Sequence, residues 1–596
     1  MELKLIDWAI IIAFFVISLA IGIIVSKRAG KNTSEFFLSG RTMPWWLLGI
    51  SMVATTFSAD TPNLVADIVR NNGVSGNWVW WSFLLTGMLT VFLYAKLWRR
   101  SKVLTDLEFY ELRYSGKEAA FLRGFRAVYL GFFFNIVAMA GVCLAAIKIG
   151  GVLLGISPVQ TLLIASVVTV IYSSLGGLKG VLITDFFQFF MAMIGSIWAT
   201  IVIVDLPEIG GLSNLIAHEN VVGKLSILPD FSNTDLLITV FIIPIAVQWW
   251  SVWYPGSEPG GGGYIAQRML SAKDEKNAVW ATLLFNIVHY AIRPWPWILI
   301  ALASLVLYPE VSDLIAALPN MDPSVVKDDI SYSVMLRYLP TGLLGLVLAS
   351  LIAAFMSTIS TLLNWGSSYM VNDLYQRFIE PKATSKKLIF VARLSTVLLM
   401  LFSSILALFL SNALQAFNII LQIGAGTGLL FILRWFWYRI NAWSEITAMV
   451  VSLFIALYFE AIHPHMGLSE LSSSTKLVFG ILITTVAWVS VTLLTKPADD
   501  KVLKSFYRLI RPGGVGWKKV LDKIKEEDPE DQGVSEKWDM PTAILCMVTG
   551  SFMVFSALFT IGYFIYGNLK FGYIMLFLTV ISTWILLKLW KKLKID

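Results

Sequence analysis

The sequence predicts an all-α protein that crosses a membrane about fifteen times. Three observations lead to this prediction: the composition, the spacing of the apolar runs, and the placement of basic residues between them. Of the 596 residues, 57% are hydrophobic and only 14% are charged, whereas soluble domains carry about 25% charged residues. This composition excludes a soluble multi-domain enzyme, and the many aromatic residues exclude a disordered chain.

A transmembrane helix needs about 20 apolar residues, and we identify fifteen such runs. The first begins with charged residues and continues as a long apolar stretch without a small-residue cleavage site, so we expect a helix there and not a cleaved signal peptide. The predicted spans are 4–26, 43–69, 77–95, 124–147, 157–177, 183–205, 235–254, 277–307, 338–370, 388–411, 414–433, 441–459, 477–495, 541–566 and 571–588.

The loops between these spans alternate in charge. One alternating set holds 37 of the 46 Lys and Arg residues, the other side holds eight, and Arg293 lies inside a span. Because cytoplasmic loops are enriched in Lys and Arg, we expect the N-terminus outside and the C-terminus inside a cell membrane. The polar segment 496–540 is predicted as a cytoplasmic surface helix with a Gly-rich break. The net charge of +7 then reflects topology and does not indicate nucleic acid binding.

Two spans contain residues that break helices. In span 2, a hydroxyl-rich run ends at Pro62. Proline has no amide hydrogen and disfavours helix just before it, which frees carbonyls to bind a cation. The alternative is a kinked helix whose hydroxyls bond to their own backbone. In span 7, Pro255–Gly263 contains two prolines and five glycines. Interrupted helices in corresponding positions mark transporter sites, and spans 2 and 7 are five apart, as an inverted five-plus-five repeat requires.

Span 9 carries hydroxyl groups on one helix face. Ser357, Ser360 and Thr361 are spaced i, i+3 and i+4, and Thr358 lies beside them. Such groups bind ions, or they hold membrane helices together.

A few charged residues lie inside the predicted spans. A charge in the bilayer costs at least about 2.5–3.5 kcal/mol and usually marks a transport pathway. For Arg293 the alternative is an internal pair with an acid. His289 sits in an apolar helix without a visible partner, and no nucleophile, zinc or phosphate-loop motif predicts an enzyme. The charged candidates are Asp60, Asp67, Asp185, Glu258 and Arg293.

Four long motifs in order give the chain its resemblance to a known family. From about Asp7 to Trp443 it resembles the sodium:solute symporters, which include sodium/sugar and sodium/proline cotransporters. The resemblance implies an amino-acid-transporter-like core: an extra helix in 1–30, repeats in 43–206 and 207–440, and extra helices in 441–596. The motifs are SEFFLSGRTMPWW (34–46), YSSLGGLKGVLITDFFQ (172–188), QRMLSAKD (267–274) and LPTGLLGLVLASLIAAFMSTISTLLN (339–364).

The resemblance also implies ion sites. One sodium ion would be bound by the carbonyls of Ala54, Phe57 and Ala354 and the hydroxyls of Ser357 and Thr358. A second would be bound by Asp185, Ser360 and Thr361, with Ser357 shared; the alternative for Asp185 is a structural cap or pairing residue. Sodium is the coupling ion, and no other cofactor is expected.

For the solute, the resemblance implies binding residues at Thr61, Ser82, Gln248, Arg293 and Asn418. Val79 stands where sugar-binding members have a glutamate, and Arg293 replaces a lysine. These departures weaken the hypothesis that the solute is a simple hexose. An arginine can hold a carboxylate with two hydrogen bonds, which favours a sugar acid or another organic anion. Tryptophans near the site can stack on a sugar ring, or they anchor helices at the membrane interface.

We therefore expect a sodium-coupled symporter that imports a small polar organic solute by alternating access. One alternative is proton coupling through Asp60 or Asp185. Another is a transporter-like sensor, which would need a signalling domain that the 496–540 loop does not supply. The expected partners are sodium, the solute and the lipid bilayer, without nucleic acid or an obligate protein partner.

Overall fold

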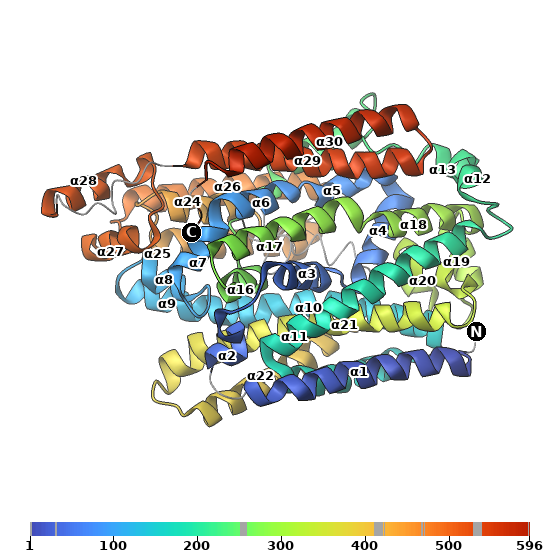
Figure 1. The fold of residues 1–596 in the computed structure, drawn as a ribbon, viewed down its shortest axis with the longest axis horizontal. Helices are drawn as coiled ribbons and strands as arrows, with labels where there is room; N and C mark the ends of the chain where they lie inside the picture. Colours follow the sequence, from blue (N-terminus) through green and yellow to red (C-terminus); the bar gives the residue numbers. More distant parts are fainter. Residues whose placement is uncertain are drawn as a thin grey trace.

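The structure is a computed structural model that describes residues 3–29, 33–250, 259–410, 421, 424–466, 469, 471–528, 539–593 and 595. In these ranges the regular elements are helices, and the extended pairing is limited to one isolated bridge between Met43 and Ala272. Several long helices, such as α1, α17, α29 and α30, run roughly along the long axis of the molecule (Figure 1).

The main helices of the first part of the chain differ widely in length, from four residues to 47. They are α1 (Leu5–Ala29), α2 (Thr33–Leu38), α3 (Trp45–Thr56), α4 (Asp60–Asn72), α5 (Trp78–Trp81), α6 (Leu84–Leu89), α7 (Ala95–Ser101), α8 (Glu108–Arg113), α9 (Gly116–Val128), α10 (Asn135–Ile149), α11 (Pro158–Val204), α12 (Leu212–Ala217) and α13 (Glu219–Val222).

The second part continues with further helices. They are α14 (Thr234–Leu237), α15 (Ile243–Ala246), α16 (Gly263–Ser271), α17 (Glu275–Ile287), α18 (Trp295–Leu307), α19 (Val311–Ala317), α20 (Ser331–Met335), α21 (Leu343–Ser368), α22 (Ser385–Ala407), α24 (Gly428–Phe436), α25 (Ala442–Leu457), α26 (Ser473–Leu494), α27 (Asp500–Ile510), α28 (Lys518–Glu527), α29 (Met540–Ile565) and α30 (Leu569–Trp590).

Apolar helices coincide with the predicted spans. Within the described ranges, nine helical stretches are long and apolar enough to cross a membrane, and five shorter apolar helices fall on other predicted spans. The predicted span 414–433 begins among residues that lie outside the described ranges. The all-helical prediction is therefore confirmed, while the count of fifteen and the inverted repeat stay predictions.

One predicted loop is wrong. Spans 157–177 and 183–205 were expected to be joined by a loop near Lys179, but the backbone is helical from Pro158 to Val204. Several glycines in this stretch lower its helix propensity and therefore suggest an interruption of the helix. A glycine disfavours a helix by only about 1 kcal/mol relative to alanine, so a few glycines among good helix formers do not by themselves end the helix.

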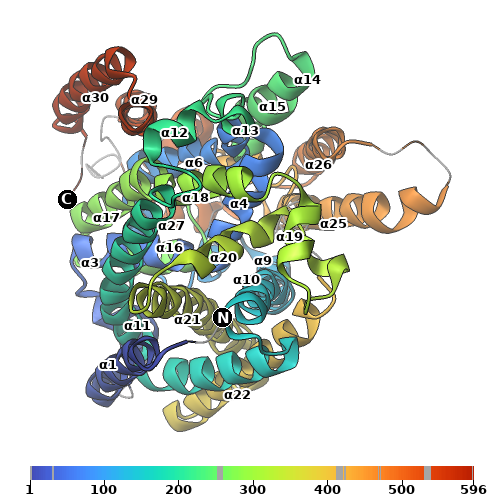
Figure 2. The same ribbon diagram turned by 90° about the vertical axis from the view of Figure 1, so that its right-hand side faces the viewer.

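α21 lies at the centre of the molecule. Nearly every one of its residues is buried, and it packs against α11, α10, α22 and α1. α11 packs in turn against α3 and α18. Viewed along the long axis, α1, α22, the α25–α26 pair and the α29–α30 pair stand at the rim (Figure 2). The rim helices expose large apolar side chains such as Phe577 and Trp584, as expected for surfaces that face lipid.

The two termini lie toward opposite ends of the long axis (Figure 1). The N-terminus shares its end with α12, α13 and α19, and the C-terminus lies toward the end that holds α27 and α28. The segment predicted as a surface helix with a break forms these two helices, which are separated at Arg511 and the glycines after it.

The rim helix α1 is fixed to the start of α21 by one carboxylate. Asp7 is 1% exposed, and its Oδ1 accepts hydrogen bonds from the backbone amides of Gly342 (2.7 Å) and Gly345 (2.9 Å). A Cβ atom at Gly345 would lie 2.5 Å from the Asp7 Cα, so the glycine permits this close approach. The carboxylate binds amides that the first turn of a helix leaves without partners.

We expect Asp7→Ala to destabilise the folded protein by about 1–3 kcal/mol, because two buried amide donors lose their acceptor. Thermal unfolding of the detergent-purified protein measures the effect. Asp7→Asn, which keeps an acceptor oxygen in place, is the control and should lose less. Equal unfolding temperatures for Asp7→Ala and the unsubstituted protein would contradict this role.

Candidate functional site

The first predicted interruption is present. α3 ends at Thr56, α4 begins at Asp60, and the residues between them leave the helical path. The break precedes Pro62, which lies in the first turn of α4. Proline is well tolerated there because first-turn amides have no helical partner. The carbonyls at the end of α3 are thus the ones released from helical pairing.

The second predicted interruption lies partly outside the described residues, since the structure describes none of 251–258. The flanks are broken as expected. α15 ends at Ala246, and α16 begins only at Gly263, after Gly260 and Gly261 with φ of +88° and +76°. Such positive φ values are readily adopted by glycine. The Gly260 carbonyl accepts a hydrogen bond of 2.6 Å from Trp98 Nε1.

The hydroxyl face of α21 lies against the first break. Thr358 is fully buried and its Oγ1 donates a hydrogen bond of 2.7 Å to the carbonyl of Thr55, which is one residue beyond Ala54. The Ala54 carbonyl accepts from the amide of Phe57 at 3.1 Å. A side-chain oxygen of one helix and released backbone oxygens of another therefore meet inside the protein.

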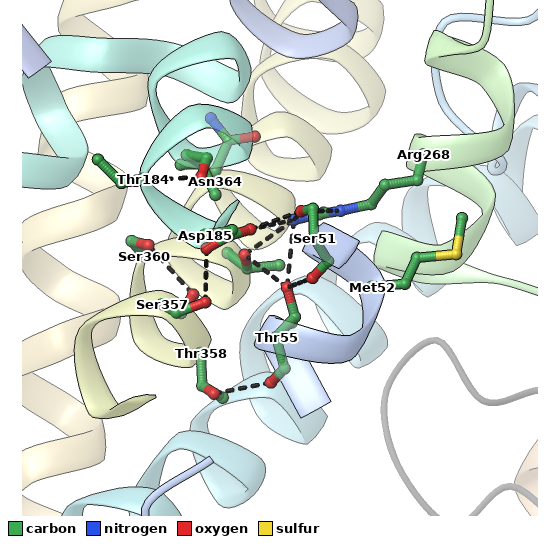
Figure 3. Close-up of polar contacts among 12 residues, drawn as sticks. Ser51, Met52, Thr55, Thr184, Asp185, Arg268, Ser357, Thr358, Ser360 and Asn364 are labelled. Carbon is green, nitrogen blue, oxygen red and sulfur yellow. Dashed lines mark hydrogen bonds and ion pairs between the residues drawn. The ribbon is translucent and has the colours of Figure 1, made fainter. Parts of the chain in front are cut away.

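A second group of oxygens is centred on Asp185 of α11 (Figure 3). Its carboxylate is fully buried and accepts hydrogen bonds from Ser357 Oγ (2.6 Å) and Ser51 Oγ (2.5 Å). The carboxylate therefore joins α11 to α21 and to α3. These contacts fit the alternative of a pairing residue, while the ion-binding role of Asp185 stays a prediction.

Arg268 of α16 reaches into the same group, although it falls in the loop between the predicted spans 235–254 and 277–307. It is fully buried. Its Nη2 donates to Thr361 Oγ1 at 3.0 Å and to Ser51 Oγ at 3.3 Å, and lies 3.8 Å from Asp185 Oδ2. The loop placement is wrong because α16 continues through Ser271, which keeps the side chain inside the protein.

The remaining hydroxyls of the α21 face differ in what they contact. Thr361 Oγ1 lies 3.3 Å from Thr55 Oγ1 in addition to accepting from Arg268. Ser360 Oγ donates to the carbonyl of Ser357 in its own helix at 3.1 Å. Figure 3 shows Ser357 directed toward Asp185 and Thr358 directed toward Thr55, whereas the dashed line from Ser360 returns to its own helix.

Arg293 lies at the other side of the break, close to Thr56. It is 1% exposed, and its Nη1 donates to Thr56 Oγ1 at 3.1 Å. Its guanidinium stacks 5.1 Å from the Trp297 ring centroid and 5.9 Å from that of Phe57. Among the residues that the structure describes, Arg293 has no carboxylate within ion-pair distance, so the expected pair with Asp60 is absent; Glu258 lies outside the described residues.

His289 has polar partners in the structure, although its neighbours in the sequence are mostly apolar. Its Nδ1 lies 3.0 Å from Thr56 Oγ1, and its Nε2 lies 3.4 Å from Arg293 Nη2. Thr56 thus contacts both side chains and fixes them beside the end of α3.

The other predicted solute-binding residues are only partly brought together. Thr61 Oγ1 donates to the Thr56 carbonyl at 3.4 Å, which keeps it at the break. Gln248 donates to the Val79 carbonyl at 2.6 Å, which joins span 7 to span 3 near Ser82. Asn418 lies outside the described residues.

Several buried polar atoms near the break have no hydrogen-bond partner within the described part of the chain. They come from α4, from the loop after α5 and from the region of α18. They are Asp60 Oδ1, both polar side-chain atoms of Asn63, Ser82 Oγ, Arg293 Nε and Trp297 Nε1. Buried polar atoms usually find partners, so these atoms are available to a polar ligand.

Sequence reasoning did not assign three residues to this site, namely Ser51, Arg268 and His289, whereas Thr55 belongs to the hydroxyl-rich run of span 2. A charged residue within the apolar run IAQRML is itself a signal for Arg268. The others are ordinary helix residues whose partners come from distant segments. Within the described ranges, no group of three or more His, Cys, Asp or Glu side chains could hold a metal ion.

Comparison with known proteins gives one family. The model of the sodium:solute symporter family matches residues 36–452. The sodium/glucose cotransporter of Vibrio parahaemolyticus is 26% identical over 525 residues, covering 84% of this chain and 92% of that protein. The sodium/sialic acid symporter SiaT of Proteus mirabilis is 26% identical over 473 residues, covering 76% and 89%.

A solved structure of a substrate-bound, outward-open sodium-coupled sialic acid symporter has a similar fold, with a TM-score of 0.66 at 22% identity over 84% of this chain and 100% of that one. The family and these relatives are sodium–solute cotransporters and not enzymes. The family match covers more than half of the chain, the fold agrees with it, and the apolar helices make this a multi-pass membrane protein. The chain therefore belongs to the sodium:solute symporter family.

Proposed function

We propose that the protein imports a small polar organic solute, with a sugar acid or related organic anion as the favoured class, by coupling its movement to sodium through alternating access. The observation that carries the sodium part is the 2.7 Å contact between the Thr358 hydroxyl and the Thr55 carbonyl at the break between α3 and α4. The proposal for the solute rests on Arg293, which has no ion-pair partner among the described carboxylates and donates to Thr56.

The first sodium ion is bound by the carbonyls of Ala54, Phe57 and Ala354 and by the hydroxyls of Ser357 and Thr358. Sodium is a hard cation, and unwound carbonyls with hydroxyls provide oxygen ligands without a full negative charge. A neutral oxygen cage binds the ion weakly enough for release inside. Ser357 donates its hydrogen to Asp185, which leaves its oxygen lone pairs available to the ion.

A second sodium ion is proposed at Asp185, Ser360 and Thr361, with Ser357 shared. Support comes from the contact of Asp185 with Ser357 and from the shared helix face of the three hydroxyls. In this structure Arg268 donates a hydrogen bond to Thr361, so one of the proposed sodium ligands already contacts a cationic side chain.

The solute lies between the break and α18, with Arg293 as its main polar contact and Thr61, Ser82, Gln248 and Asn418 as further ones. A guanidinium stacked on Trp297 is pre-oriented to bind a carboxylate with two hydrogen bonds. The sodium/sialic acid symporter among the relatives handles a solute of this charge class. The unpartnered atoms of Asn63 and Ser82 suit hydroxyl groups of such a solute.

The repeats 43–206 and 207–440 would be related by inversion and would alternate access around this site. The N-terminus is outside and the C-terminus cytoplasmic in the plasma membrane. Proton coupling through Asp60 or Asp185 is the competing hypothesis, and the relatives named above are all described as sodium-coupled. Uptake driven by a pH gradient alone in sodium-free proteoliposomes would favour protons.

For the first sodium site, we expect Thr358→Ala to raise the sodium concentration that half-saturates uptake about tenfold or more. We take the loss of one oxygen ligand of the ion as comparable with the loss of a hydrogen bond to a charged group, about 1.5–3 kcal/mol, and about 1.4 kcal/mol is a tenfold change in affinity. Uptake in proteoliposomes at fixed pH over a sodium series measures it.

Thr358→Ser keeps the hydroxyl and is the matched control for this site, so its sodium dependence should stay close to that of the unsubstituted protein. Membrane insertion of both variants is checked by fractionation. An unchanged sodium dependence for Thr358→Ala would remove Thr358 from the ion site.

For the solute, we expect Arg293→Gln to weaken binding of anionic solutes about 10- to 100-fold, since it removes a charge-assisted hydrogen bond. Arg293→Lys retains the charge without the planar pair of donors, so its affinity for anionic solutes should lie between those of Arg293→Gln and the unsubstituted protein. A thermal-shift screen of neutral sugars, sugar acids and amino acids identifies the solute first. If Arg293→Gln binds an anionic solute as tightly as the unsubstituted protein does, the arginine has a structural role only.

A further inference from the structure

The oxygens proposed for a second sodium ion already hold a cation that belongs to the chain. The guanidinium of Arg268 lies 3.0 Å from Thr361 Oγ1 and 3.8 Å from Asp185 Oδ2. It also donates to Ser51 Oγ from Nε and Nη2, each at 3.3 Å, and Ser51 in turn donates to Asp185. Figure 3 shows these contacts between the Arg268 side chain and the Asp185 group.

The charges in this group balance as it stands. Arg268 and Asp185 both have side chains that are 0% exposed, and the other members are neutral hydroxyls. One carboxylate is matched by one guanidinium. A sodium ion placed on the same oxygens would add a second positive charge within a few ångströms of the first, and like charges repel strongly where water is excluded.

The two cations would be held by different parts of the fold. Asp185 comes from α11, and Ser357, Ser360 and Thr361 come from α21, which are both long and continuous. Arg268 comes from α16, a nine-residue helix that follows the second interruption. The guanidinium therefore ties a short helix beside a break to the two long helices, whereas the proposed sodium ligands all lie on the long helices.

Arg268 also has partners that move with it. Its Nη1 donates to Oε1 of Gln267 at 3.2 Å, and its guanidinium lies 5.8 Å from the ring centroid of Tyr264. Both residues belong to α16. The guanidinium thus keeps a hydrogen-bond acceptor and an aromatic ring when it leaves Asp185.

We propose that the Arg268 guanidinium and a sodium ion compete for the oxygens of Asp185 and Thr361, so that the ion binds there only when Arg268 withdraws. Sodium entry then releases α16 from α11 and α21, and sodium departure restores the tie. This inference rests on the proposed sodium-coupled function and adds to it a residue that controls ion affinity at the second site.

The test is equilibrium binding of radioactive ²²Na⁺ to the purified full-length protein. We expect Arg268→Gln to bind the second ion with a dissociation constant at least tenfold lower than in the unsubstituted protein, because Asp185 loses its resident cation. Arg268→Lys keeps the charge and should bind sodium as the unsubstituted protein does. The double variant Arg268→Gln/Asp185→Asn has neither charge and should not show the increased sodium affinity of Arg268→Gln.

A second measurement needs no substitution. Hydrogen–deuterium exchange of the unsubstituted protein, compared in sodium and in potassium at equal ionic strength, reports local opening of a helix. We expect faster exchange for peptides of α16 in sodium, because the ion releases Arg268. Unchanged or slower exchange of α16 in sodium would overturn the proposal even if Arg268→Gln failed to fold.

The outcomes separate this inference from the function on which it rests. If the unsubstituted protein binds ²²Na⁺ but Arg268→Gln binds it with unchanged or weaker affinity, the competition is overturned and sodium coupling stands. If the unsubstituted protein binds no ²²Na⁺, sodium coupling fails and the competition fails with it.

Discussion

The break between α3 and α4 is the constraint on which the site depends. Backbone carbonyls inside a membrane cannot turn to water, so each must find a partner within the protein or from a bound ion. Thr358 of α21 provides one such partner through its contact with the Thr55 carbonyl. Because α21 is buried along nearly its whole length, the helices that pack around it fix the position of this hydroxyl relative to the break.

Charge is distributed unevenly on the two sides of that break. Toward α11, the buried carboxylate of Asp185 is matched by Arg268 and by two hydroxyl donors. Toward α18, the guanidinium of Arg293 is held by Thr56 and by aromatic rings, and no described carboxylate lies within ion-pair distance of it. Each side of the break thus holds a buried charge: a carboxylate that faces Arg268 toward α11, and a guanidinium without an ion-pair partner among the described residues toward α18.

Local patterns in the sequence predicted the features that depend on neighbouring residues. Apolar length located the helices, Pro62 located the first break, and helical spacing grouped Ser357 with Thr361. The missed features depend on residues far apart in the chain. Arg268 falls between two predicted spans, and its burial could not be foreseen because its partners Asp185 and Thr361 come from other helices. The glycines near Lys179 suggest a break, whereas the backbone hydrogen bonds of α11 continue through them.

The central claim is that a sodium ion lies between the end of α3 and the hydroxyl face of α21. The most direct measurement is a pair of high-resolution cryo-electron microscopy maps of the same preparation, one in sodium and one in N-methylglucamine at equal ionic strength. A compact density in contact with the Thr358 hydroxyl and the released carbonyls of α3, seen in sodium and absent in N-methylglucamine, is the predicted result. Identical maps at this position under sodium concentrations that saturate uptake would contradict it.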